Sequence, residues 1–349
     1  MSEMKQRNSN VELLRIVAMC MIIDVHYFGN CNAATLAVPG TGNWIVFQVL
    51  ESLGICGVNL FVLITGFFSV NQYEIKIRKM VNLLVDIAFW GGVGYLLSMI
   101  VGWKGFDAKS LIKTVFPILF GGRWFVKAYL ILSCLIPFIN LVIHSITKKS
   151  FQKLLLILFL LFSVWPSFLP NPPVDDYGYG FVHFIVLYLI AAYIRLYLNV
   201  YPPKWTCLLG FVCATAMVIV CSMMGVGYAW AYNFVLVIAG AASLFLWFIQ
   251  LDIRSKAINV LASCAFGVFL IHTDGFFSEL IYHRLFHDLE LVHGNAILFL
   301  LSCIGSLPFF YLFGFLLESI KKKLFAVSID QWLYQIAPIN APVIITKKE

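Results

Sequence analysis

Charged residues are scarce in this sequence: Asp, Glu, Lys and Arg make up 12% of its 349 residues, against about 25% in a typical soluble domain. Hydrophobic residues make up 61%, and the mean hydropathy is +0.91. The apolar residues fall in repeated stretches of about 20, the length that a helix needs to cross a bilayer. The composition therefore excludes an ordinary soluble domain and predicts an all-α polytopic membrane protein.

Several other features are missing. None of the nine cysteines belongs to a C-x-x-C pair, and almost all lie inside apolar stretches, so we expect neither a disulfide framework nor a metal site. There is no evident internal repeat and no linker long enough to separate a second soluble domain. The first apolar stretch has no small-residue cleavage site, which favours a retained span over a removed signal. The net charge of +7 does not indicate nucleic acid, because the basic residues fall in short loops between spans.

The apolar stretches predict about ten transmembrane helices. Gly54 and Gly57 fall inside the second stretch, which therefore looks like two pieces and is a candidate for a break. The predicted spans cover residues 9–28, 44–68, 78–101, 124–146, 152–168, 181–199, 205–224, 231–250, 257–280 and 295–317.

The distribution of basic residues orients these spans. With ten spans, seventeen of the 24 lysines and arginines fall on the side that carries both termini, six fall on the other side, and Arg15 lies within a span. Cytoplasmic loops carry the excess of Lys and Arg, so both termini are predicted to be cytoplasmic. We expect one transmembrane domain at 1–325 and a cytoplasmic tail at 326–349.

The first span, SNVELLRIVAMCMIIDVHYF, carries Arg15 and His26. Eleven positions are nearly three helical turns, so both side chains should emerge on almost the same face, about 16 Å apart along the axis. One interpretation is a cavity lined by a cation near one end and an imidazole near the other. The alternative is that both side chains reach the two bilayer interfaces. Ser9 and Glu12 predict a capping box at the start of the helix, and Glu12 is a favourable neighbour for Arg15.

Four stretches, in this order along the chain, resemble motifs of the acyltransferase-3 family of membrane-bound acyltransferases. They are RNSNVELLRI at 7–16 with Arg15 and His26 separated by ten residues, NLFVLITGFF at 59–68, RWF at 123–125 with YL at 129–130, and FGVFLIH at 266–272. Two positions depart from the family pattern. Thr65 replaces the usual serine and keeps a hydroxyl, whereas Phe269 replaces a common tyrosine and loses one.

The resemblance implies an integral O-acyltransferase of the bacterial cell (cytoplasmic) membrane. It implies acetyl-CoA as the acyl donor and, as the acceptor, a hydroxyl of a surface polysaccharide or lipid-linked glycan. We assign His26 as the general base on the acceptor hydroxyl, because the unperturbed pKa of histidine lies near neutrality. Arg15 is assigned to the anionic donor, because a guanidinium offers forked donors to phosphate.

Four further residues are candidates for substrate binding. Arg123 and Lys127 share a helical face and could contact an anionic acceptor or the developing oxyanion, with lipid headgroup contact as the alternative. Trp124 could stack on a sugar or belong to an interfacial aromatic belt. His272 is either a site residue or a hydrogen-bonded structural histidine.

Other polar residues have plainer interpretations. Asp86 predicts a structural ion pair, and Lys321 to Lys323 predict an anchor to acidic lipid. His283 and His287 have a metal-binding spacing but no supporting motif, so no metal is predicted. The main rival function is a carrier or flippase for a lipid-linked or amphipathic glycan, which should show matched halves that this sequence lacks. A catalytically idle relative is a third hypothesis, against which the presence of both Arg15 and His26 argues.

Overall fold

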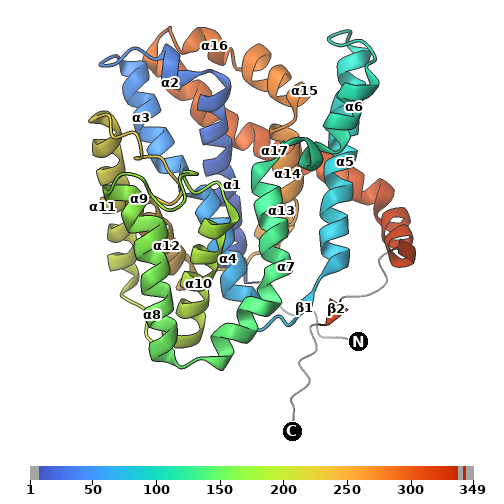
Figure 1. Ribbon diagram of the computed structural model, residues 1–349. Coiled ribbons are helices and arrows are strands. Elements are labelled where there is room, and N and C mark those ends of the chain that lie inside the picture. Colours follow the sequence, from blue (N-terminus) through green and yellow to red (C-terminus); the bar gives the residue numbers. More distant parts are fainter. Residues whose placement is uncertain (1–7, 337–340, 343–349) are drawn as a thin grey trace. The chain divides into compact units, whose positions relative to one another are not determined.

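The computed structural model describes residues 8–336 and 341–342 (Figure 1). It is 76% helical. The chain divides into two compact units. The first unit holds the described residues up to Phe61 together with Val200–Ile320, and the second holds Val62–Asn199 with the described residues from Lys321 onward.

Six helical stretches among the described residues, two of them made of more than one element, are long and apolar enough to cross a membrane. These candidate spans are Gly42–Ser69, Ile77–Ile100, Trp124–Ser145, Lys148–Phe168, Lys204–Met223 and Ala296–Phe325. The remaining four predicted segments differ for identifiable reasons. Helix α1 (Ser9–Asn30) carries three charged residues, α10 (Phe181–Tyr197) and α12 (Val235–Ile249) are short, and the 257–280 segment is broken. The all-α membrane class is thus confirmed, whereas the count of ten and the side of the termini stay predictions.

In the first unit, α1 packs against α3 (Gly42–Gly54), α12, α13 (Lys256–Ala262) and α14 (Ala265–His272). A buried amide supports this packing, because Asn10 on α1 donates to the carbonyl of Phe248 on α12 at 2.8 Å. Elsewhere in the same unit Asn59 donates to the carbonyl of Tyr232, just before α12, at 2.8 Å. Helix α11 (Lys204–Met223) lies beside α12 (Figure 1). The short α2 (Ala33–Leu36) follows α1.

The predicted break in the second span is confirmed. Helix α3 ends at Gly54 and α4 (Gly57–Ser69) begins after two residues. A Cβ added to Gly54 would lie 2.8 Å from the carbonyl oxygen of Met21, and one added to Gly57 would lie 2.8 Å from that of Ala18. The two glycines therefore let the broken span approach the backbone of α1.

The first unit continues after α14 with short elements that lead to a long helix. These are α15 (Gly275–Ser278), the π-helix η3 (Glu279–Leu285), α16 (Asp288–Leu291) and α17 (Ala296–Ile336).

The second unit is built around α7 (Trp124–Ser145), α8 (Lys148–Phe159) and α10. The amide of Asn140 on α7 donates to the carbonyls of Ser69 and Gln72, and its oxygen accepts from the Tyr188 hydroxyl at 2.6 Å. These bonds hold the end of α4 against α7 and α10. The other elements are β1 (Glu74–Ile75), which pairs with β2 (Ala341–Pro342), α5 (Ile77–Ile100), α6 (Ala108–Val115), η1 (Pro117–Phe120), η2 (Leu160–Val164) and α9 (Trp165–Phe168).

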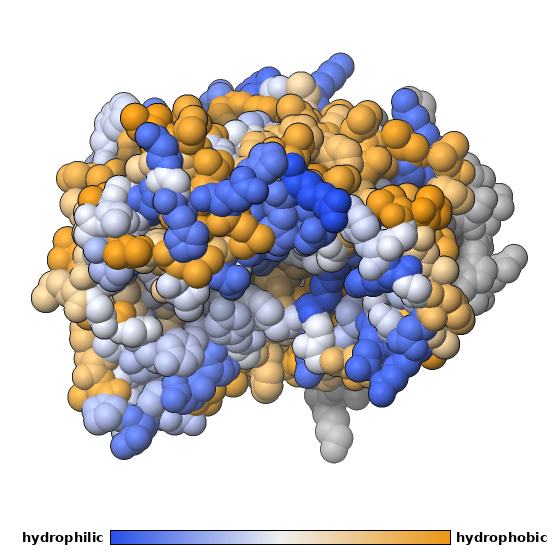
Figure 2. Space-filling view, turned by 90° about the horizontal axis from the view of Figure 1, so that it is seen from above, coloured by the Kyte–Doolittle hydropathy of each residue, from blue (hydrophilic) through white to orange (hydrophobic). Residues whose placement is uncertain are grey.

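Large apolar side chains are exposed along the outward faces of several helices. Leu209, Val212 and Val220 on α11 and Leu301 and Ile304 on α17 are each about half exposed. Figure 2 shows broad hydrophobic areas beside hydrophilic ones on the face that it displays. A soluble monomer rarely exposes this much contiguous apolar surface, and contact with lipid accounts for it.

Two predictions about charged and polar groups need correction. The capping box is wrong: Asn8 is the N-cap of α1, the Ser9 hydroxyl bonds Ser255, and Glu12 pairs with Arg15. Lys321 does not reach lipid, because it is 5% exposed and pairs with Asp86, which confirms the structural ion pair expected for Asp86.

The predicted tail at 326–349 begins inside α17, which continues to Ile336. The remainder of that tail lies outside the described residues, except for the two residues of β2. Four of the basic residues in the charge count also lie outside the described residues: Lys5, Arg7, Lys347 and Lys348.

Candidate active site

The candidate site is organised along α1 in the first unit. Arg15 and His26 both lie on this uninterrupted helix of 22 residues. A regular helix keeps their offset at about 16 Å and their side chains on nearly the same face. Both side chains are partly exposed, while Leu14 and Tyr27 beside them are fully buried. The face that carries them is thus the less occluded one.

His26 is paired with His272, the last residue of α14. Nδ1 of His26 lies 2.7 Å from Nε2 of His272, and the ring centroids are 4.9 Å apart. His272 is 1% exposed, whereas His26 is intermediate. The structure therefore joins two of the candidate residues that the sequence placed on different helices.

The hydrogen bond made by Nδ1 of His272 determines which nitrogen atoms of the pair carry protons. Nδ1 of His272 lies 2.9 Å from the carbonyl oxygen of Val268, which can only accept a hydrogen bond. In neutral His272 the proton is therefore on Nδ1, and its Nε2 accepts. Nδ1 of His26 must then be the donor to His272, so Nε2 of neutral His26 carries the lone pair and is the basic nitrogen.

Aromatic side chains surround the buried imidazole. The rings of Phe269 and Phe310 lie 5.7 Å and 6.1 Å from that of His272. Tyr282 packs on Phe310 and donates its hydroxyl to the carbonyl of Ile23 on α1. This packing fixes the ring of His272, and the ring in turn orients His26.

Arg15 forms the expected pair with Glu12. Nη1 of Arg15 lies 2.7 Å from Oε1 of Glu12, with the side chains 33% and 8% exposed. A guanidinium has five N–H donors, and this is its one hydrogen bond to the described residues. Arg15 is therefore held in place with donors left for a ligand.

Buried carboxylates lie behind the site. Asp24 is 4% exposed and accepts a bond from the thiol of Cys303 at 3.0 Å, so it meets another helix. Glu51 is also buried, and its Oε2 makes no hydrogen bond within the part of the chain that the structure describes. Neither residue touches His26 through a hydrogen bond, so the orienting partner of His26 is an imidazole.

Arg123, Trp124 and Lys127 belong to the second unit, at the start of α7. Arg123 is the N-cap residue and adopts a left-handed conformation with φ 57°, while Lys127 is exposed. The Trp124 ring lies 4.4 Å from that of Tyr179 and 6.3 Å from that of Phe184. Trp124 is thus packed among aromatic residues of its own unit, and the structure does not join these three residues to the histidine pair.

Comparison with known proteins shows to which protein family the chain belongs. The model of the acyltransferase-3 family, described as an acyltransferase domain, matches residues 8–315. The chain belongs to the acyltransferase-3 family. The match includes every candidate residue from Arg15 to His272. Neither the curated proteins nor the solved structures that were compared with the chain include a match.

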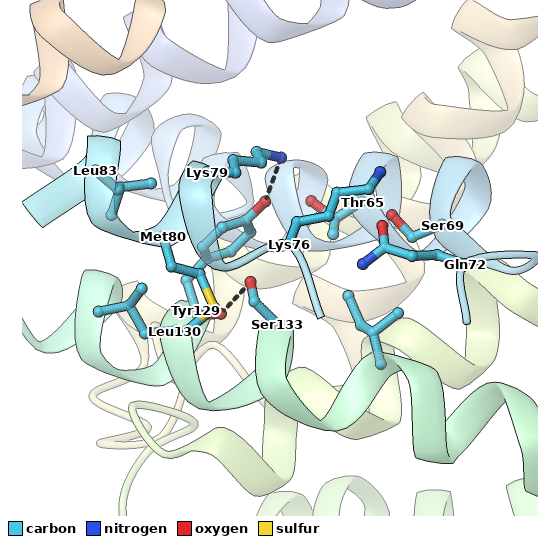
Figure 3. A pocket seen from close by; sticks show the side chains of 11 residues that line it. Thr65, Ser69, Gln72, Lys76, Lys79, Met80, Leu83, Tyr129, Leu130 and Ser133 are labelled. Atoms are coloured by element: carbon cyan, nitrogen blue, oxygen red, sulfur yellow. Dashed lines mark hydrogen bonds between the residues drawn. The ribbon is translucent and has the colours of Figure 1, made fainter. Parts of the chain in front are cut away.

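An acyltransferase of this family needs an acyl donor and an acceptor, and its apolar helices need a bilayer. Both departures from the family pattern can be located. Phe269 supplies an apolar wall to His272 instead of a hydroxyl, and Thr65 on α4 keeps a hydroxyl that lines a pocket to which α5 and α7 also contribute (Figure 3).

The histidines beyond α14 have local partners. His283 lies 2.7 Å from the Oδ1 of Asp288, and His287 lies 3.8 Å from Glu290. Across residues 8–336 and 341–342, no group of three or more His, Cys, Asp or Glu side chains could hold a metal ion.

Asp288 makes the stability of the segment between α14 and α17 depend on pH. Burial raises the pKa of its carboxyl above the ordinary 3.8, with His283 opposing the shift, and its Oδ2 has no partner among the described residues. A raised carboxyl pKa means that the folded state favours the uncharged form. The contribution of Asp288 to stability is therefore complete below about pH 4 and declines as pH rises through the folded pKa. We expect Asp288→Asn to remove this decline from thermal midpoints measured between about pH 4 and 7.

The exposed carboxyl of Asp252 supplies the matched control, because its side chain is 83% exposed. Asp252→Asn should leave the pH dependence of the midpoint unchanged. An Asp288→Asn protein with the wild-type pH dependence would contradict the assignment.

Proposed function

We propose that this membrane acyltransferase moves an acetyl group from acetyl-CoA to a hydroxyl of a cell-surface polysaccharide or lipid-linked glycan. The observation that carries the proposal is the bond between His26 and His272, which leaves Nε2 of His26 basic. We place the enzyme in the bacterial cell membrane with ten crossings and cytoplasmic termini. That orientation puts Arg15 toward the donor side and His26 toward the acceptor side.

Direct transfer needs one base and one anion-binding group. Nε2 of His26 takes the proton from the acceptor hydroxyl as its oxygen attacks the thioester carbonyl carbon. The carbon–sulfur bond then breaks, and the CoA thiolate takes the proton from Nε2, so the enzyme returns to its starting state. We propose that Arg123 and Lys127, with Trp124 against the sugar, serve the acceptor side.

The length of the donor matches the separation of the two α1 residues. Arg15 and His26 are about 16 Å apart along the axis, so the two side chains cannot both contact the reacting carbonyl. We assign the phosphates of acetyl-CoA to Arg15 and the thioester to the vicinity of His26. The thin pantetheine arm would then run along α1.

The decisive experiment follows release of free CoA thiol by the purified protein in detergent, with and without an extract of the host's surface glycans. Release that requires both the extract and His26 supports the acetyltransferase. A protein that neither binds acetyl-CoA nor releases thiol with any extract would overturn it in favour of the carrier. Succinyl-CoA in place of acetyl-CoA tests the preference for the donor.

The role of Arg15 predicts a defect in donor affinity. Arg15→Ala removes charge-assisted hydrogen bonds to phosphate, each worth about 1.5–3 kcal/mol, so the KM for acetyl-CoA should rise about tenfold to a hundredfold. Because Glu12 would lose its partner, the same measurement is made on the double variant Glu12→Gln/Arg15→Ala. The matched control is Arg254→Ala, which removes an exposed arginine that also pairs with a carboxylate. Unchanged donor affinity in both Arg15 variants would exclude the assignment.

A further inference from the structure

The connection between α9 and α10, in the second unit, contains a tight turn at residues 175–179, here called the tyrosine turn (Figure 1). The carbonyl of Asp176 accepts a hydrogen bond from the N–H of Tyr179 at 2.9 Å, and the two central residues, Tyr177 and Gly178, have φ of 54° and 79°. This is the pattern of a type I′ turn. The Asp176 carboxylate also accepts from the N–H of Gly178, at 2.9 Å, which stabilises the turn further.

Tyr177 is an unusual residue for its position. The central positions of a type I′ turn are dominated by Gly, Asn and Asp, because a side chain is disfavoured at positive φ. Packing does not account for the tyrosine, since the residue is 45% exposed. Residues held in such conformations cluster at ligand-binding and active sites. An exposed tyrosine in this conformation therefore indicates contact with a ligand.

Tyr179 connects the tyrosine turn to a third aromatic residue. The ring of Tyr179 lies 4.4 Å from that of Trp124 at the start of α7, and Tyr179 is 47% exposed. Trp124 is partly exposed and lies 6.3 Å, between ring centroids, from the fully buried Phe184. The core of the unit thus supports the indole, while both tyrosines of the turn remain exposed.

The charge of the tyrosine turn indicates what kind of ligand it fits. Asp175 is exposed and Asp176 is partly exposed, and they directly precede Tyr177. Exposed Tyr and Trp also occur in interfacial belts, where they meet lipid headgroups. Two carboxylates oppose an anionic headgroup, whereas they accept hydrogen bonds from hydroxyl groups. A sugar ring complements both features, because its hydroxyls suit a carboxylate and its C–H face suits an aromatic ring.

We propose that the tyrosine turn and Trp124 form a subsite for a sugar ring of the acceptor glycan. The assignment of this sugar to the acceptor rests on the function proposed above, in which Trp124 serves the acceptor side. Tyr177 and Tyr179 contact the C–H face of the ring, and the carboxylate of Asp175 accepts from its hydroxyls. The subsite selects which glycan binds, and it takes no part in proton transfer.

The test measures binding of oligosaccharides, released by mild acid from the host's surface glycans, to the purified full chain by saturation-transfer difference NMR. Tyr177→Ala/Tyr179→Ala should weaken binding at least about tenfold, the usual effect of truncating aromatic hot spots. Tyr177→Phe/Tyr179→Phe keeps both rings and should retain most of the affinity. The matched control, Tyr73→Ala/Phe106→Ala, removes two exposed rings elsewhere in the same unit and should change nothing. A wild-type protein that binds none of these oligosaccharides would overturn the subsite.

Tyr177→Gly separates loss of a ligand contact from a defect in folding. Glycine adopts positive φ without steric cost, so this variant should keep or raise the thermal midpoint while its affinity for the oligosaccharides falls about three- to tenfold. Asp175→Asn removes a charged acceptor and should weaken binding by a similar factor. Asp252→Asn, at an exposed carboxylate outside the turn, is the control for charge. Wild-type affinity in both Tyr177→Gly and Asp175→Asn would exclude the proposed contacts.

A lipid arm uses native mass spectrometry of the protein taken from bilayer discs that contain phosphatidylglycerol. Retained lipid that Tyr177→Ala/Tyr179→Ala loses, with unchanged binding of oligosaccharides, assigns the rings to an interfacial belt and overturns the subsite. Equal retention of lipid in the variant and the wild type, together with weakened oligosaccharide binding, supports the sugar.

Failure of the subsite is distinguishable from failure of the proposed function. Thiol release that depends on His26, with the same half-saturating concentration of glycan extract in the double alanine variant and the wild type, leaves the function standing and rejects the subsite. Oligosaccharide binding that requires both tyrosine rings, in a protein that never releases thiol, does the reverse.

Discussion

Replacing His26 by alanine is expected to lower acetyl transfer by about 10²- to 10⁴-fold, the usual contribution of a general base. The loss should fall on kcat, because the imidazole acts on the reacting hydroxyl and not on the donor's phosphates. Affinity for CoA should stay within about twofold of the wild type. Steady-state thiol release at saturating acetyl-CoA measures the first quantity, and calorimetry the second.

His272 gives a graded second test of the same arrangement. His272→Ala leaves the Nδ1 proton of His26 without its acceptor, so the tautomer of His26 is no longer fixed. We expect a loss of about 10- to 100-fold in kcat and a changed pH profile. His272→Gln keeps an acceptor oxygen near the same place and should recover part of the rate.

The exposed His287 supplies the control, since it lies outside the pair and His287→Ala should leave kcat unchanged. An enzyme whose kcat survives in His26→Ala would exclude the general base. A His272→Ala protein with the wild-type pH profile would reduce His272 to a packing role.

The second large effect is a loss of stability, which we expect when Gly57 is replaced by a residue with a side chain. A Cβ at this position would meet the carbonyl oxygen of Ala18 at 2.8 Å and the Cβ of Met21 at 3.0 Å. The first neighbour is backbone in the middle of α1, so it cannot move without shifting the helix that carries His26. Gly57→Ala should therefore cost about 1–3 kcal/mol, the usual cost of overpacking, and Gly57→Leu more. Thermal midpoints in detergent measure the change.

Gly92 is the matched control. It lies within α5, and a Cβ there would meet nothing within 4 Å. Gly92→Ala should be neutral or stabilising by about 0.5–1 kcal/mol, since alanine loses less backbone freedom on folding. A Gly57→Ala midpoint equal to that of the wild type would show that α1 and α4 can separate at little cost.

The sequence predicted part of the candidate site. Helical spacing put Arg15 and His26 on one face, and the proximity of Glu12 to Arg15 predicted their ion pair. His272 became a candidate only through a family resemblance, and no spacing rule could predict its bond to His26, because the two residues are 246 positions apart. Such a contact depends on how helices pack, which a periodicity does not encode.

The fold, like the candidate site, was predicted only in part. The glycines at 54 and 57 predicted the break between α3 and α4 because their effect is local. Lys321 was assigned to lipid because it follows a long apolar run, whereas it pairs with Asp86, 235 positions away. Span prediction by hydropathy also treated 257–280 as one helix, although α13 and α14 are separated at Ser263 and Cys264.

The central place of α1 has a consequence for how the protein is made. Helix α1 is synthesised well before its partners: Asn10 bonds Phe248, His26 bonds His272, and Tyr27 bonds Ser302. At about 5–20 residues per second, roughly 12–50 seconds of synthesis separate the two histidines. Throughout that interval Asp24 has no Cys303 to bond, so the nascent chain carries an unpaired carboxyl group in the apolar helix α1. The histidine pair is therefore among the last features to form, and the half-made protein cannot transfer acyl groups by the mechanism proposed here.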